Sequence, residues 1–192
     1  MISTAHQLPK PKSRRKTTRR TKIRESASAD RAAVAAADGR PFRDIQPSAF
    51  GRIAQTRWSE TLVFRGAAIK GAERSSFKNT ELMFEACELL ATHYRGMHIS
   101  GEPEARAAYE RRLRELGLDW HFAVTKRAAG LAGDRFLVTF PELGGKWGRK
   151  KILLRHHLRF GAGRDPRHLL RVYFAWHQPT QRVLVGHLPT HL

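Results

Sequence analysis

The strongest constraint on the fold comes from the end of the chain, where apolar and polar side chains alternate along three consecutive segments. These segments are residues 150–160, 169–176 and 182–188. Because successive side chains of a strand point to opposite faces, a period of two predicts three β-strands with one apolar face each. Only the segment HQPTQ separates the last two, which predicts an antiparallel hairpin.

Helical periodicity dominates the middle of the chain. The spacing of apolar residues predicts helices over 47–64, 81–95 and 104–116. Thr80 is the expected cap of the second helix, and Gly117 the residue that ends the third. The last two helices are expected to form a helical hairpin. The segment GAAIKGAERSS after the first helix contains two glycines and is predicted to be a link.

Shorter alternating segments at 119–125 and 134–140 predict two further strands. The fold class expected is therefore α+β, with N-terminal helices, including the helical hairpin, packed on a small, mostly antiparallel sheet. We expect a single domain over 41–192. Residues 1–40 comprise a basic tract and a linker of small residues, whose apolar surface is too small to repay the entropy of ordering. They are predicted to be a disordered tail.

The charge of the chain points to polyanionic partners. The net charge is +19, and residues 1–24 contribute nine lysines and arginines without an acid. Nucleic acid is the first expectation for such a surplus, ahead of an acidic protein or an anionic membrane surface. The tail residues expected to contact nucleic acid are Arg14, Arg15, Lys16, Arg19 and Arg20.

The C-terminal hairpin is predicted to gather polar groups on one face. If Trp176 lies opposite Arg182, then alternation places Arg171, Tyr173 and His187 together on an exposed or cleft-lining face. A slip of one residue would move a strand's side chains to the other face, so this expectation depends on the register. The core-facing set would be Leu170, Val172, Phe174, Trp176, Leu184 and Leu188.

The preceding strand and the loop after it are predicted to extend this basic face. Asp165 is expected to be structural, in a turn before Pro166 or in an ion pair with Arg164 or Arg167. The residues expected to join the face are Arg155, His157, Arg159, Arg164, Arg167 and His168.

The residue types on this face suit phosphate chemistry. Imidazole titrates near neutral pH and can act as acid or base, while arginine binds phosphate and keeps its charge. Only one carboxylate occurs in the last fifty residues, a poor supply of the oxygen ligands that Mg²⁺ prefers. The predicted catalytic residues are Arg171 on phosphate, His187 or His157 exchanging protons, and Tyr173 assisting them. A basic face that only binds RNA would have the same composition.

The remaining chemistry-bearing residues support simpler expectations. The C-terminal histidines lack the cysteine and carboxylate pattern of a zinc site, so neither a metal nor a cofactor is predicted. Cys87 lies in an apolar run and is expected to be buried. The single cysteine and the absence of a long apolar run predict a cytoplasmic protein with no membrane partner.

The order of elements resembles the RelE/ParE superfamily of bacterial toxins. A helical hairpin is followed by strands ending in R-x-Y-F and V-x-V-G-H, over at most residues 76–192. The resemblance implies a compact antiparallel sheet on two helices, with groups of the final hairpin acting on ribosome-bound mRNA in the RNase members. It also implies an acidic antitoxin as partner. The matching residues are Arg155, His157, Arg171, Tyr173, Val185, Gly186 and His187.

Three functions are compatible with this sequence. The favoured one is an RNA-binding, toxin-like protein, extended to a metal-independent endoribonuclease. The second is a non-enzymatic nucleic-acid-binding module of a larger defence or mobile-element assembly. The third is a basic scaffold that docks an acidic protein. The ending also resembles that of uncharacterised bacterial proteins, and ParE-like toxins use a similar fold without RNase chemistry.

Overall fold

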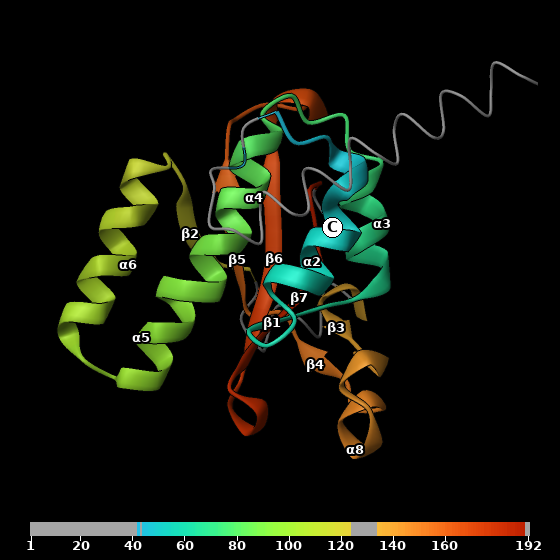
Figure 1. Ribbon diagram of the computed structural model, residues 1–192, viewed down its shortest axis with the longest axis vertical. Coiled ribbons are helices and arrows are strands. Elements are labelled where there is room, and N and C mark those ends of the chain that lie inside the picture. The colour runs from blue at the N-terminus through green and yellow to red at the C-terminus, as the bar shows by residue number, and fades with distance from the viewer. Residues whose placement is uncertain (1–41, 43, 124–133, 191–192) are drawn as a thin grey trace, which may run out of the picture.

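The computed structural model describes residues 42, 44–123 and 134–190 (Figure 1). The main helical elements are α2 (Phe50–Arg57), α3 (Gly66–Glu73), α4 (Thr80–Leu89), a π-helical turn (Leu90–Tyr94), α5 (Arg95–Ser100), α6 (Pro103–Glu115) and α8 (Gly145–Gly148). Short 3₁₀ turns occupy Pro47–Ala49, Asp134–Phe136, Pro141–Leu143, Pro166–His168 and Gln178–Thr180. The strands are β1 (Leu62–Phe64), β2 (Asp119–Phe122), β3 (Leu137–Val138), β4 (Ile152–Leu153), β5 (His156–Phe160), β6 (Leu170–His177) and β7 (Arg182–His187).

Five of these strands form one sheet in the order β1-β7-β6-β5-β2. The pair β1 and β7 is parallel, and the other neighbours are antiparallel. Strands β3 and β4 form a separate two-stranded sheet. Helices α2, α3 and α4 cover the main sheet, and α5 and α6 form a hairpin beside α4 (Figure 1). The predicted α+β class is therefore confirmed, while the predicted disordered tail lies outside the described residues.

The first predicted helix and the link after it are wrong. The helix ends at Arg57, and residues 62–64 form β1, all three of them buried. Pairing with β7 overrides the helical spacing, because Leu, Val and Phe fit a buried strand well. The expected link is α3, whose Ala68 and Ala72 are fully buried. Gly71 allows the close packing of α3, since a Cβ there would collide with the carbonyl oxygen of Leu188.

The two helices of the helical hairpin were predicted more accurately than the first helix. Its first helix is capped by Asn79 instead of Thr80, because the Asn79 side chain accepts a hydrogen bond from Leu82 N at 3.0 Å. The helix continues through the π-helical turn and ends at Gly101, in the left-handed conformation (φ 70°). Gly117 (φ 64°) follows α6, as expected for a residue that ends a helix.

The strand boundaries differ from the prediction at two places. The expected strand at 134–140 contracts to the two residues of β3, after a 3₁₀ turn. The expected strand at 150–160 divides into β4 and β5, which belong to different sheets. The main apolar core, which we call the helical core, lies between the helices and the main sheet. Leu154 lies between β4 and β5 and is buried in a second, separate apolar cluster, so the chain changes direction there.

The register of the final hairpin is shifted by one residue from the prediction. Trp176 pairs with Val183 instead of Arg182, and a bulge then pairs Tyr173 with His187. The extra residue is Gly186, where a Cβ would lie 2.5 Å from Leu154 Cδ1. The bulge depends on the tertiary contact between Gly186 and Leu154, and alternation along a single strand does not reveal it.

The second apolar cluster covers part of the sheet face opposite the helices. It contains Tyr173, which is 2% exposed, so the expectation of an exposed or cleft-lining Tyr173 is wrong. Leu184 belongs to it too, because the shifted register moves this residue away from the helical face. The members are Val63, Phe136, Val138, Phe140, Leu154, Tyr173, Ala175 and Leu184.

Candidate nucleic-acid interface

A row of three imidazoles and one phenol crosses four strands of the main sheet. His121 on β2 pairs with His157 on β5, His157 pairs with Tyr173 on β6, and Tyr173 pairs with His187 on β7. The rings of His121 and His157 are stacked with centroids 5.6 Å apart, and those of His157 and Tyr173 with centroids 5.1 Å apart. The His187 ring meets Tyr173 edge-on at 6.1 Å. We call these four residues the imidazole row.

A row of charged residues, which we call the charged row, lies two positions away from the imidazole row on β2, β5 and β6. Asp119 pairs with Arg159, and Arg159 pairs with Arg171. The Arg159 guanidinium donates to Asp119 Oδ2 at 3.0 and 3.2 Å. The same carboxylate oxygen lies 3.9 Å from His121 Nε2, so it links the two rows. The face therefore combines titratable rings with fixed positive charge.

Arg171 is held by the backbone around it. Its guanidinium donates to the carbonyl oxygens of Phe160 and Leu170, both at 2.8 Å, and of Gly161 at 3.3 Å. Burial, and then the neighbouring Arg159, lower the pKa of Arg171. Gly161 (φ 77°) is required here, because a Cβ would also collide with the carbonyl oxygen of His168. Arg171 thus closes the end of the β5–β6 connection and is fixed in position.

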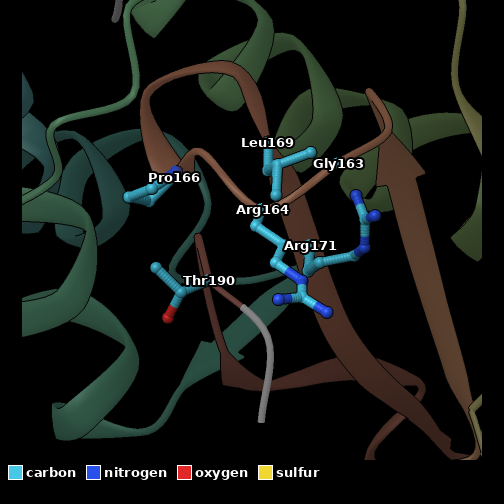
Figure 2. A pocket seen from close by; sticks show the side chains of 6 residues that line it. All are labelled: Gly163, Arg164, Pro166, Leu169, Arg171 and Thr190. Carbon is cyan, nitrogen blue, oxygen red and sulfur yellow. The ribbon is translucent and has the colours of Figure 1, made fainter.

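A pocket of about 420 Å³ opens beside Arg171 (Figure 2). Arg164 reaches it from the β5–β6 connection, and Thr190 lines it from the residues after β7. The Thr190 hydroxyl lies 3.2 Å from His187 Nε2, within hydrogen-bond distance. The pocket therefore joins two predicted arginines to one end of the imidazole row, which is a suitable place for a phosphate group.

The other predicted binding residues do not all lie beside this pocket. Arg167 is paired with Asp165 through contacts of 2.8 to 3.1 Å, which confirms the structural role expected for Asp165. This pairing lowers the pKa of Asp165 to about 2. His168 Nε2 lies 4.0 Å from the same carboxylate. Arg155 lines a different cavity, at the opposite end of β5. The predicted tail residues Arg14, Arg15, Lys16, Arg19 and Arg20 lie outside the described residues.

The prediction of a shared face for Arg171, Tyr173 and His187 is correct, although their catalytic roles stay predictions. Tyr173 belongs to the second apolar cluster and Phe174 to the helical core, so the two residues face opposite ways. His157 joins the row as expected. His121 was missed, because its place depends on β2 pairing with β5, which alternation along one segment does not reveal.

A second cavity, of about 560 Å³, was also missed. It lies where β5 begins and β6 ends, and it is lined by aromatic rings and cations. Trp147 and Trp176 both line this cavity, and Trp176 also packs against the helical core, as expected for a core-facing residue. Tyr94, from the π-helical turn, also lines this cavity. The signal in the sequence is the concentration of Trp, His and Lys around residues 146–151 and 176–177.

Burial of His156, beside this second cavity, makes the stability of the fold depend on pH. Burial, then His98 and Arg155, lower the pKa of His156 to about 4 from its usual 6.5. The folded protein therefore binds fewer protons than the unfolded chain between these values, so stability falls as pH decreases from about 6.5 to 4. After allowance for partial exposure, we expect a loss of about 1–2 kcal/mol from this group.

Urea midpoints at pH 7 and pH 5 measure this effect. His156→Phe should reduce the difference between the two midpoints, because the ring is kept and the titration removed. The exposed His168→Asn variant is the control and should keep the wild-type difference. An unchanged pH dependence in His156→Phe would contradict the assignment.

The described residues have three further properties. Cys87 is fully buried, as predicted, and burial raises the pKa of its thiol. Within the described ranges, no group of three or more His, Cys, Asp or Glu side chains is placed to hold a metal ion. None of the described helices is long and apolar enough to cross a membrane.

No protein-family model, curated protein or solved structure matches this chain. The assignment of a function therefore has to come from the geometry of the site and the charge of the chain.

Proposed function

We propose that the protein binds RNA on the sheet face that carries the imidazole row, and cleaves it without a metal ion. The observation that supports this most is the imidazole row. Its three imidazoles and one phenol lie directly beside Arg159 and Arg171 of the charged row. General acid, general base and phosphate-binding cations are the groups that such a cleavage needs.

The proposed reaction is an internal transesterification. One imidazole, from His157 or His187, takes the proton of the RNA 2′-hydroxyl as its oxygen attacks phosphorus. The bond from phosphorus to the 5′-oxygen breaks, and a protonated imidazole of the row donates a proton to that oxygen. The products are a 2′,3′-cyclic phosphate and a 5′-hydroxyl. Arg171 and Arg164, on the adjoining pocket, stabilise the charge that builds on the phosphoryl oxygens.

Binding without cleavage is the second candidate, and two observations favour it. The Arg171 guanidinium donates to three carbonyl oxygens, which leaves it fewer N–H groups for phosphate. Tyr173 is 2% exposed, so its hydroxyl is shielded from a substrate unless the second apolar cluster moves. In this reading the face is a nucleic-acid-binding module, within a defence or mobile-element assembly.

The resemblance to RelE/ParE toxins narrows the proposal further. It favours ribosome-bound mRNA in the cytoplasm as the substrate and a small acidic antitoxin as the partner. The positive charge of the chain, +19, suits both. If the chain binds an acidic protein while the same preparation shows no affinity for RNA, the scaffold function would be favoured.

The test is incubation of the full chain with free RNA and with ribosome-bound mRNA in EDTA. We expect RNA binding that weakens steeply with salt, because phosphate contacts release counterions. We also expect fragments that end in cyclic phosphate. Tight, salt-dependent binding with no fragments from either substrate would leave the binding module as the function. The absence of both binding and fragments would overturn the proposal.

A further inference from the structure

The second cavity has the composition of a site for a flat, partly polar ligand. Its walls come from the π-helical turn, α5, α8, and strands β4, β5 and β6. Its volume, about 560 Å³, falls within the usual range of ligand sites. The aromatic side chains on its walls are Tyr94, His98, Trp147, His156, Trp176 and His177.

These rings are ordered by contacts with one another. His98 and Trp176 are stacked, with centroids 4.9 Å apart and planes 12° apart. Tyr94 meets His98 edge-on at 4.6 Å. On the other side, Trp147 meets His177 edge-on at 5.0 Å. The cavity is thus bordered by a group of three rings and by a separate pair. The group includes Tyr94, at the end of a π-helical turn, and such turns often mark functional sites.

Three polar atoms of these walls lack a hydrogen-bond partner among the described residues. They are Tyr94 Oη, His156 Nδ1 and His177 Nε2. The Tyr94 side chain is fully buried, and His177 is 6% exposed, with its other nitrogen 2.8 Å from Thr180 Oγ1. A buried polar group without a partner is costly and needs an explanation. These atoms have almost no accessible surface, so they show how deeply this wall is buried.

Cations line the same cavity. Lys150, Lys151 and Arg155 belong to its lining, and Lys150 holds its ammonium group 5.1 Å from the Trp147 ring centroid. Positive charge next to aromatic rings is the usual arrangement where single-stranded nucleic acid is bound, since rings stack on bases and cations contact phosphates.

We propose that this cavity receives one unpaired base of the bound RNA, with Lys150, Lys151 and Arg155 on the adjacent phosphates. The inference rests on the proposed RNA binding but not on cleavage. The face of the base contacts the rings of the walls. Burial lowers the pKa of both His156 and His177, so the two rings are neutral at pH 7 and offer hydrogen bonds without charge.

The cavity and the imidazole row lie on one strand. On β6, Arg171 and Tyr173 alternate onto the same face as His177, which lines the cavity. Arg171 and His177 are six residues apart, which corresponds to about 20 Å. On β5, His156 lines the cavity from the helical face, and the next residue, His157, belongs to the row on the opposite face. A single extended RNA strand can therefore place a base in the cavity and a phosphate beside the row. The base pocket would fix which phosphate reaches the row, and so confer a preference on the substrate.

The test compares short, fluorescent, single-stranded RNAs that are 2′-O-methylated throughout, so that none can be cleaved. One series carries a single abasic site at each position in turn. We expect one position at which loss of the base weakens binding to the wild type about 5–150-fold. In Trp147→Ala the intact RNA should bind more weakly, and the abasic site should have little further effect. Trp147→Phe, which keeps a ring, should behave more like the wild type.

Each outcome decides between the two proposals. Equal binding of intact and abasic RNAs would overturn the base pocket and leave RNA binding intact. If no RNA binds, the proposed function falls, and adenosine 5′-monophosphate and ribose 5-phosphate then test the cavity alone. Preference for the nucleotide, with shifts of the Trp147 and Trp176 indole NMR signals, would support the pocket. Equal binding of the two, or none, would overturn it.

Discussion

Replacing His157 by alanine is expected to lower the rate of RNA cleavage about 10²–10⁴-fold, the usual cost of losing a general acid or base. His187→Ala should show a loss of the same order. RNA affinity should change much less, because many cations of the face and tail remain. The measurement is single-turnover cleavage in EDTA, with affinity determined in parallel on a 2′-O-methylated RNA.

The imidazole row provides matched controls for this experiment. His93→Ala removes an imidazole of the π-helical turn, outside the row and the predicted binding residues, and should keep the wild-type rate. Tyr173→Phe keeps the ring that stacks on His157 at 5.1 Å and removes only the hydroxyl, so it separates packing from chemistry. If His157→Ala and His187→Ala both cleave at the rate of the wild type, the imidazole row is not catalytic. Parallel losses of rate and of the urea midpoint would point to unfolding instead.

The fold could be predicted where local pattern and tertiary packing agree. Alternation found β5, β6 and β7, and helical spacing found α4 and α6, because each of these elements directs a periodic set of apolar side chains into the helical core. The same approach failed for β1 and α3. The three residues of β1 are buried together and have no alternation to read. In α3 the small residues that looked like a link are the means of close packing on β7.

The candidate site was predicted in part for the same reason. Alternation placed Tyr173 and Phe174 on opposite faces correctly, and that result does not depend on the partner strand. The register of β7, the burial of Tyr173 and the position of His121 do depend on partners. They follow from the bulge at Gly186, from the second apolar cluster and from the pairing of β2 with β5, which bring together segments far apart in sequence.

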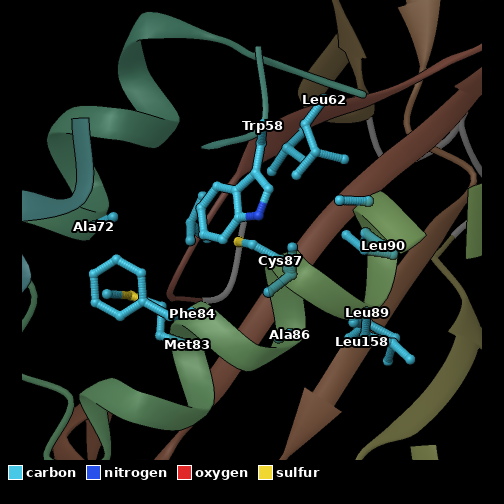
Figure 3. Close-up of a cluster of buried hydrophobic side chains, with 14 of the residues drawn as sticks. Trp58, Leu62, Ala72, Met83, Phe84, Ala86, Cys87, Leu89, Leu90 and Leu158 are labelled. Atoms are coloured by element: carbon cyan, nitrogen blue, oxygen red, sulfur yellow. The ribbon is translucent and has the colours of Figure 1, made fainter. Parts of the chain in front are cut away.

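Trp58→Ala should be the most damaging single change to stability, at about 3–5 kcal/mol of the free energy of unfolding. The side chain is 1% exposed and belongs to the same core cluster as Leu62, Phe84 and Cys87 (Figure 3). Its ring centroid lies 5.9 Å from that of Phe64 and 6.3 Å from that of Phe84. A protein of this size has about 5–15 kcal/mol in total, so the variant would be close to unfolding.

A hydrogen bond adds to the packing of Trp58. Its indole N–H donates to Glu88 Oε2 at 2.7 Å, and Arg57 Nε donates to the same oxygen at 2.8 Å. Although burial raises the pKa of Glu88, these two donors outweigh it and lower the pKa overall. Trp58→Ala removes one donor from a partly buried carboxylate as well as the ring, and loss of a hydrogen bond to a charged group costs about 1.5–3 kcal/mol.

Urea titration of three variants separates these contributions. Trp58→Phe should keep most of the ring packing and lose mainly the hydrogen bond, so its midpoint should lie between those of the wild type and Trp58→Ala. Trp147→Ala removes an indole that belongs to neither core cluster, and it should lower the midpoint far less. Equal midpoints for Trp58→Ala and Trp147→Ala would show that the aromatic cluster does not hold α2, α4 and β1 together. The expected order, with Trp58→Ala lowest, follows from where each ring is buried and not from the size of the residue removed.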